Sequence, residues 1–188
     1  MAATNDEVAD PFAGLGSRAE DFEMVRGVLR EAEGMGGRDG ALTGDLLGEL
    51  VHFVREQDLG IVCNSIPQFE MVRKPRTILK PDISFVAKER LPDEVWVGIV
   101  PIAPDLATEV ASPSNRRAQI IDKVGLYLAG GTRLVWVVRP EHRTVTVFRP
   151  DRPERILGID DELDGEDVLP GFRLPLARLF RPRGRFAR

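Results

Sequence analysis

Two carboxylates on predicted neighbouring strands have the residue type and spacing that could support chemistry. Asp82 lies in a predicted strand over residues 80–86, and Glu109 lies in a second one over residues 105–111. Side chains alternate between the faces of a strand, and directly opposite side chains of paired strands lie roughly 4.5–5.5 Å apart. If the two strands pair, both carboxylates can therefore meet on one face of a sheet, within reach of a shared cation.

A lysine on the following segment adds a positive charge to this pair. Residues 114–128 are predicted to form a helix, because their apolar residues recur at helical spacing. These residues are Ile120, Val124, Tyr127 and Leu128. Lys123 flanks the apolar face, so a helix packed on the sheet would aim it at the strand that carries Glu109. A salt-bridged cluster without catalytic function would use the same three charged residues, and the spacing alone favours neither alternative.

The composition restricts the kinds of metal site that the chain could hold. A single cysteine, Cys63, excludes an internal disulfide and a cysteine-cluster metal site. The two histidines, His52 and His142, are too few for a histidine-rich zinc site. A bound metal would therefore be a hard cation with oxygen ligands, such as Mg²⁺ or Mn²⁺.

The length and charge set further limits on the class of protein. The chain has 188 residues, of which 43% are hydrophobic, and a net charge of -4. These values fit one domain with a sizeable core, and they argue against a general nucleic-acid binder while leaving a local basic groove open. No run approaches the roughly 18 apolar residues of a membrane span, and no secretion signal is present. The sequence thus predicts a cytoplasmic protein with no membrane partner.

The chain is predicted to fold as one domain over residues 20–180. A flexible leader over residues 1–19 precedes the domain, and a basic tail over residues 181–188 follows it. Within the domain, a first helix is predicted over residues 18–33 and a second over residues 43–57, each from apolar residues at helical spacing.

Short strands are predicted over residues 61–65 and 68–72, ahead of the strand that carries Asp82. Residues 132–138 are strongly apolar and include Trp136, which predicts a central strand. A hairpin then leads into a strand over residues 144–148.

The C-terminal part contains an acidic segment and a final strand. The carboxylates of residues 160–167 lack the Gly-centred spacing of a calcium loop, so this segment is predicted to be a solvated loop. Residues 169–176 are predicted to form a strand that continues into a short helix ending near Phe180.

An ordered series of short motifs resembles a known family. The motifs are Lys80-Pro81-Asp82, residues 104–114 (PDLATEVASPS), residues 123–128 (KVGLYL), residues 135–138 (VWVV) and residues 169–172 (LPGF). Together they resemble the bacterial Uma-type restriction endonuclease family, a branch of the PD-(D/E)XK nuclease superfamily, over roughly residues 41–180.

The resemblance implies an α/β fold, with a restriction endonuclease-like mixed β-sheet flanked by helices. It also implies that Asp82 and Glu109 are the two motif acids, and that Lys123 replaces the lysine that the superfamily usually carries at the position of Ala111. Arg139 stands where the family usually has an aspartate. Glu49 is a candidate for a further acid from the N-terminal helices.

These residues suit hydrolysis of phosphodiester bonds. Mg²⁺ in proteins typically has one or two carboxylate ligands and several waters, and Asp82, Glu109 and the carbonyl of Val110 could supply the protein ligands. Lys123 would orient groups and stabilise charge rather than act as a base. The predicted function is an Mg²⁺- or Mn²⁺-dependent endonuclease that acts on DNA as a homodimer. The alternative is a catalytically inactive module that keeps the fold to bind nucleic acid or protein.

Overall fold

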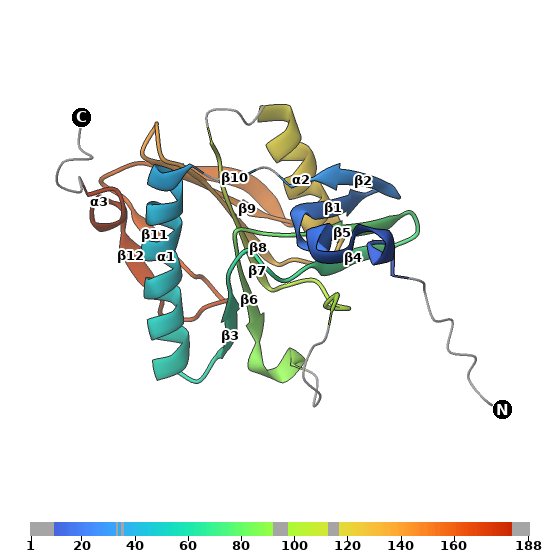
Figure 1. Cartoon of the computed structure of the whole chain (residues 1–188). Helices are drawn as coiled ribbons and strands as arrows, with labels where there is room; N and C mark the ends of the chain where they lie inside the picture. The colour runs from blue at the N-terminus through green and yellow to red at the C-terminus, as the bar shows by residue number, and fades with distance from the viewer. Residues whose placement is uncertain (1–9, 33, 35, 92–97, 113–116, 182–188) are drawn as a thin grey trace.

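A six-stranded mixed sheet with helices on both faces forms the centre of the molecule (Figure 1). The computed structural model describes residues 10–32, 34, 36–91, 98–112 and 117–181. In spatial order, the sheet consists of β10 (Arg152–Leu157), β9 (Thr144–Arg149), β8 (Leu134–Arg139), β7 (Leu106–Val110), β6 (Ile83–Ala87) and β3 (Gly60–Cys63). The predicted α/β fold with a mixed sheet and flanking helices is therefore confirmed.

The central strands are apolar because side chains cover them on both faces. β8 pairs in parallel with β7 and antiparallel with β9, and Trp136 in β8 is completely buried. A parallel pair in the middle of a sheet needs cover on both sides, which explains the continuous apolar run in β8. The predicted central position of Trp136 is confirmed.

One face of the sheet is covered by α1 (Gly37–Glu56) and the C-terminal elements. Leu46, Leu50 and Val54 recur every four residues along α1 and pack in one core with Trp136. β11 (Glu162–Asp164), β12 (Arg173–Pro175) and α3 (Leu176–Leu179) complete this layer.

The other face is covered by α2 (Arg117–Ala129) and a second sheet. The four strands of this sheet are, in spatial order, β2 (Val28–Glu31), β1 (Phe22–Val25), β5 (Arg76–Leu79) and β4 (Phe69–Arg73). Ile120, Val124 and Tyr127 of α2 pack into this second core. In Figure 1, α1 and α2 lie on opposite sides of the six-stranded sheet, so the two cores share it.

The prediction of a helix over residues 18–33 is wrong. This segment contains the end of a 3-10 helix, η1 (Ala13–Asp21), followed by the hairpin of β1 and β2. Arg26 and Gly27 link the two strands with φ values of 51° and 82°. Two successive residues with positive φ form the tight turn typical of a two-residue hairpin and cannot belong to an α-helix. The apolar residues that suggested a helix instead belong to these two short strands.

Part of the predicted leader also belongs to the folded domain. Residues 1–9 lie outside the described residues, but Phe12 is only 2% exposed and packs with Met24 and Ile78. Burial of this aromatic side chain ties η1 to the second sheet. Of the predicted basic tail, only Arg181 is described, and it is exposed.

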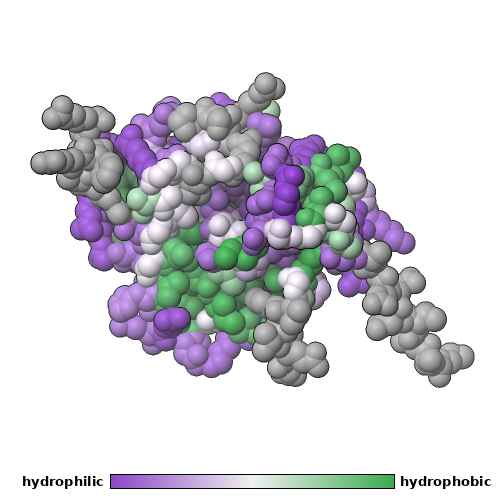
Figure 2. Space-filling view, viewed as in Figure 1, coloured by the Kyte–Doolittle hydropathy of each residue, from purple (hydrophilic) through white to green (hydrophobic). Residues whose placement is uncertain are grey.

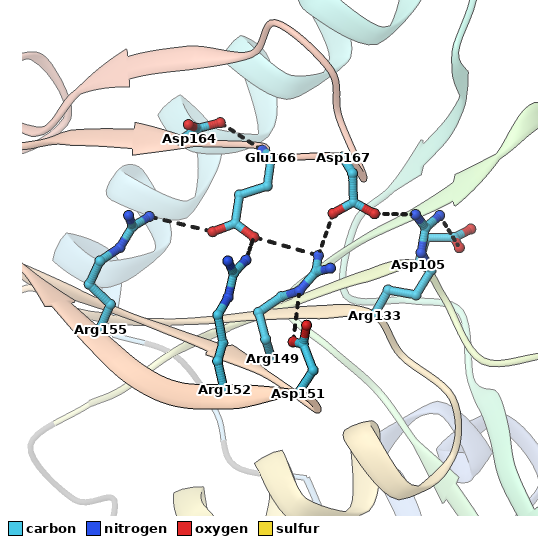
Figure 3. Close-up of polar contacts among 9 residues, drawn as sticks. All are labelled: Asp105, Arg133, Arg149, Asp151, Arg152, Arg155, Asp164, Glu166 and Asp167. Carbon is cyan, nitrogen blue, oxygen red and sulfur yellow. Dashed lines mark hydrogen bonds and ion pairs between the residues drawn. The ribbon is translucent and has the colours of Figure 1, made fainter.

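The prediction that residues 160–167 form a solvated loop is wrong as well. They include β11, whose Leu163 is fully buried, and Glu166, which forms ion pairs with arginines of β9 and β10 (Figure 3). Residues 152–157, for which no strand was predicted, form β10. The acidic segment therefore packs against the sheet, where arginines balance its charge.

Two further features concern the surface. Figure 2 shows apolar surface over the β1–β2 hairpin and around β3, and Val28 in β2 and Ile61 in β3 are 59% and 43% exposed. Both strands lie at the ends of their sheets. No helix in the described ranges of the chain is long and apolar enough to span a membrane.

Candidate functional site

Asp82 and Glu109 lie side by side on adjacent strands. β6 and β7 are antiparallel, with Ile83 opposite Thr108, so the next pair along the same register is Asp82 and Glu109. Asp82 is also anchored to the second strand, because the backbone N–H of Val110 donates to its Oδ2 atom at 2.7 Å. The expected adjacency of the two strands is confirmed, and both carboxylates face the side of the sheet that α2 covers.

Lys123 extends from α2 to Glu109, as its place beside the apolar face predicted. Its Nζ atom lies 2.9 Å from Glu109 Oε1 and 3.0 Å from Oε2, so the ammonium contacts both carboxylate oxygens. The hydroxyl of Tyr127, one turn further along α2, donates to Glu109 Oε1 at 2.6 Å. The helix thus holds Glu109 through one cation and one neutral donor, while its apolar residues pack on the sheet.

A third carboxylate, Glu23 of β1, completes the cluster and was not predicted from the sequence. Glu23 Oε1 lies 2.9 Å from Lys123 Nζ and accepts the backbone N–H of Lys80 at 2.6 Å. The sequence predicts a helix for its segment, which instead forms β1. Only Gly27, a turn residue between two short apolar stretches, could have indicated a hairpin here.

Burial of the two predicted acids changes their acidity. Burial, reinforced by the charges of Asp82 and Glu23 and opposed by Lys123, raises the pKa of Glu109 to about 8. Burial also raises the pKa of Asp82, although the Val110 N–H and Lys123 oppose this shift. Both carboxyls therefore bind protons more readily than exposed ones do, and a divalent cation would favour their charged forms.

Lys123 and Tyr127 respond to the same environment. Burial alone would lower the pKa of Lys123, but the charges of Glu109 and Glu23 outweigh it and raise the pKa above its usual value. Burial raises the pKa of Tyr127 well above the normal value, with Glu109 adding to the effect. At neutral pH, Lys123 is therefore an ammonium and Tyr127 a neutral hydrogen-bond donor.

The cluster lines an open pocket of about 600 Å³. The β1–β2 hairpin, the start of α1, the adjoining ends of β6 and β7, and α2 form its walls. The side chains on these walls carry both signs of charge. Besides Glu23, Asp82, Glu109 and Lys123, the charged residues are Glu20, Asp21, Arg30, Glu31, Lys80 and Asp122. The pocket is accessible to a ligand larger than an ion.

Comparison with known proteins identifies the family. Residues 12–177 match the model of a family described as "Uma2: Putative restriction endonuclease". The chain belongs to the Uma2 family. Similarity to a family of this description agrees with the expectation drawn from the ordered motifs. None of the curated proteins is significantly similar to the chain in sequence.

A solved structure shares the fold of this Uma2 chain. It is the crystal structure of a putative nuclease belonging to DUF820 from Anabaena variabilis ATCC 29413, and its sequence is 21% identical. The two structures superpose with a TM-score of 0.77 over 85% of this chain and 89% of the other. At this identity, the similarity establishes the common fold.

The donor set of the Uma2 chain suits a hard cation bound by few protein ligands. No group of three or more His, Cys, Asp and Glu side chains in the described part of the chain is arranged to hold a metal ion by itself. Asp82 and Glu109 nevertheless form an oxygen-only pair, and Mg²⁺ commonly uses one or two carboxylates with several waters. Burial and the neighbouring carboxylates raise the pKa of both acids, because they destabilise the charged forms. A cation bound between the two acids would stabilise these charged forms.

Other residues considered from the sequence lie away from the pocket. Glu49 pairs with Arg178 on the α1–α3 side, and His52 is exposed beside Glu56. His142 is exposed in the turn between β8 and β9. Arg139, at the end of β8, is half-buried and does not line the pocket. Glu49 is therefore not the third acid of this site, since Glu23 lies there instead.

Proposed function

We propose that this chain is an Mg²⁺- or Mn²⁺-dependent endonuclease that hydrolyses phosphodiester bonds of DNA. The observation that carries the proposal is the convergence of Asp82, Glu109 and Lys123 in an open pocket, with Lys123 Nζ 2.9 Å from Glu109 Oε1. Membership of a family described as putative restriction endonucleases supports the same reaction class.

In this proposal, Asp82 and Glu109 hold the cation, with the carbonyl of Val110 as a third ligand. Val110 lines the pocket and its N–H already orients Asp82 at 2.7 Å. The proposal assigns the metal ion to Asp82 Oδ1, since the Val110 N–H donates to the other oxygen, Oδ2. A bound Mg²⁺ would neutralise charge on the phosphoryl oxygens and lower the pKa of a bound water.

Lys123 supplies positive charge to the reacting phosphate. Since Glu109 and Glu23 raise its pKa, the ammonium keeps its proton and cannot act as the base that activates water. It can donate a hydrogen bond to a phosphoryl oxygen that gains charge in the transition state. Tyr127 fixes the orientation of Glu109 through its hydroxyl, 2.6 Å from Oε1.

Cleavage of plasmid and linear duplex DNA tests the proposal. With Mg²⁺ or Mn²⁺, the wild type should cut, whereas Asp82→Asn and Lys123→Ala should lose activity by orders of magnitude. Lys123→Arg should restore little, because a guanidinium is not a compact point charge. Glu31→Gln is the matched control: it removes a charge from the same pocket, 69% exposed, and should keep activity. An inactive wild type, or equal cleavage by Lys123→Ala, would contradict the proposal.

A dimer would suit cleavage of both strands, because two active sites related by a two-fold axis match the symmetry of duplex DNA. Exposed apolar side chains at the edge strand β2, where Val28 is 59% exposed, support association between chains. Sedimentation at several protein concentrations should give twice the mass of one chain. A single-chain mass at all concentrations would contradict the homodimer.

A second candidate function is binding of nucleic acid or protein without catalysis. The observation in its favour is the acidic wall of the pocket, where Glu20, Asp21 and Asp122 would repel DNA phosphates and favour a basic protein segment instead. Glu109 is also already bound by two donors, Lys123 and Tyr127. A wild type that never cleaves DNA, but binds a basic peptide or retains DNA in a mobility-shift assay, would favour this function.

A further inference from the structure

Glu23 contacts Lys123, and the proposed function gives this carboxylate no role. Its Oε1 atom lies 2.9 Å from Lys123 Nζ and accepts the N–H of Lys80 at 2.6 Å. The side chain is only 11% exposed, and its strand is fixed between β2 and β5. The position of this carboxylate is therefore determined by backbone contacts and does not depend on Lys123 alone.

Lys123 has two counter-ions, and a divalent cation would compete for one of them. Its ammonium contacts both oxygens of Glu109, at 2.9 and 3.0 Å. A cation held by Glu109 would lie close to the ammonium and would repel it. Glu23 then remains as the carboxylate that can hold Lys123 in the pocket.

The contacts of Glu23 point to action through Lys123 and not through the metal. Both contacts use the same oxygen, Oε1, which the backbone N–H of Lys80 and the Lys123 ammonium already occupy. No group of three acids in the described ranges is arranged around a metal position. Glu23 is thus suited to hold the lysine next to a metal site formed by Asp82 and Glu109.

We propose that Glu23 is a positioning residue, which keeps the Lys123 ammonium in the pocket when a cation occupies Glu109. The proposal rests on the proposed metal-dependent function for its role in catalysis. Whether Glu23 retains Lys123 when Glu109 is neutral can be measured without DNA and without metal.

Competitive acylation of lysines gives this measurement. The chain has four lysines, Lys74, Lys80, Lys88 and Lys123, so mass spectrometry can follow each one. Lys88 pairs with Asp58 on the surface, is 58% exposed and serves as the internal reference. Only the free amine reacts, so a lysine held as an ammonium between carboxylates is acylated slowly.

The Glu109→Gln substitution removes the negative charge that a bound cation would otherwise compensate. In Glu109→Gln, acylation of Lys123 should rise by less than roughly tenfold relative to Lys88, because one counter-ion is lost but Glu23 still holds the ammonium. In the Glu23→Gln, Glu109→Gln double variant, acylation of Lys123 should rise by roughly tenfold or more, the change that one pKa unit produces in free amine. Equal rates in the double variant and Glu109→Gln would overturn the proposal.

A second arm covers the case in which the double variant does not fold. Glu23→Gln alone should react slowly without metal and roughly tenfold faster with saturating Mg²⁺, while Lys123 of the wild type should change much less. Glu31→Gln, which also removes one carboxylate from the pocket, should behave as the wild type. A wild type whose Lys123 becomes as reactive with Mg²⁺ as that of Glu23→Gln would also overturn the proposal.

Cleavage separates this inference from the proposed function. If the enzyme cuts DNA, Glu23→Gln should lower kcat with little change in KM, because the misplaced ammonium acts mainly in the transition state. If no variant cuts DNA but the acylation pattern holds, the nuclease proposal fails and the role of Glu23 stands. If DNA is cut but acylation of Lys123 is insensitive to Glu23, the role of Glu23 fails alone.

Discussion

At the scale of single residues, the site is defined by the balance of buried charges. Three carboxylates, Glu23, Asp82 and Glu109, surround one ammonium, that of Lys123. One cation cannot compensate three buried anions, so burial raises the pKa of Glu109 to about 8. A site of this kind gains stability from a second cation or from a proton, which makes it sensitive to both.

The first prediction concerns the pH dependence of stability without divalent ions. The pKa of Glu109 is about 8 in the folded protein against a reference of 4.5. The folded state thus binds more protons between these values. The stabilisation from protonated Glu109 is complete below pH 4.5 and is lost as the pH rises through 8. Glu109→Gln, which mimics the neutral acid, should gain stability over the wild type by about 2–4 kcal/mol from pH 5 to pH 8.

Thermal or urea unfolding at several pH values checks this. Glu70→Gln is a suitable control, since Glu70 is similarly buried at 11% exposed but pairs with Arg76 outside the pocket. A difference between Glu109→Gln and the wild type that stays constant with pH would contradict the prediction.

The residue scale also shows which parts of the site the sequence could reveal. Asp82, Glu109 and Lys123 lie in elements with clear periodicity, and their faces follow from alternation and helical spacing. Glu23 could not be found in this way. Its partners lie 57 and 100 residues further along the chain, at Lys80 and Lys123, and only the pairing of β1 with β5 brings them together.

At the scale of elements, the site depends on how α2 is seated. This helix carries Lys123 and Tyr127, and its C-terminal end lies against β4, where an added Cβ on Gly130 would be 2.8 Å from Met71 Cβ. A helix that can approach a strand this closely needs a residue without a side chain at the contact. The position of α2 on the sheet therefore determines the distance between Lys123 and Glu109.

The second prediction compares two glycines near this helix. Gly130→Ala should destabilise the protein by about 1–3 kcal/mol and weaken Mg²⁺ or Mn²⁺ binding, because the strand and helix must separate. Gly125→Ala, on the exposed face of α2 with no atom within 4 Å of an added Cβ, should stabilise the fold by about 0.5–1 kcal/mol. Chemical denaturation and calorimetric titration of the metal measure both effects. Equal stabilities of the two variants would show that the close contact does not position the helix.

Elements with strong periodicity were predictable, and those defined by turns were not. The helix predicted over residues 43–57 corresponds to α1, and the strands carrying Trp136 and Glu109 appear as β8 and β7. The β1–β2 hairpin was missed because its four-residue strands are too short to show alternation. Its turn, moreover, has an arginine with positive φ, where glycine or asparagine is usual.

At the scale of the whole molecule, the pocket and a network of ion pairs lie at opposite ends of β7. Glu109 is near the C-terminal end of this strand, and Asp105 directly precedes its start. Asp105 meets Arg133, which also contacts Asp167, and the network continues through Arg149 to Glu166 (Figure 3). It joins the acidic segment after β11 to the β9–β10 hairpin. The C-terminal end of β7 therefore contributes to the pocket, and the ion pairs near its N-terminal end hold the C-terminal layer on the sheet.

The third prediction tests this division by removing Glu166 from the network. Glu166 is 15% exposed and forms ion pairs with Arg149, Arg152 and Arg155, and Arg149 itself is 13% exposed. Glu166→Gln leaves Arg149 largely buried with fewer counter-charges, so the free energy of unfolding should fall by about 1–3 kcal/mol.

Glu162→Gln provides the matched control, because its pair with Arg173 is exposed on both sides and should contribute less than about 1 kcal/mol. Urea denaturation measures the stabilities, and titration with Mn²⁺ measures the site. The network lies near the N-terminal end of β7, whereas Glu109 is near the C-terminal end. The affinity for Mn²⁺ should therefore be the same in Glu166→Gln and the wild type. A loss of metal affinity in Glu166→Gln would mean that the C-terminal layer and the pocket are coupled through the shared sheet.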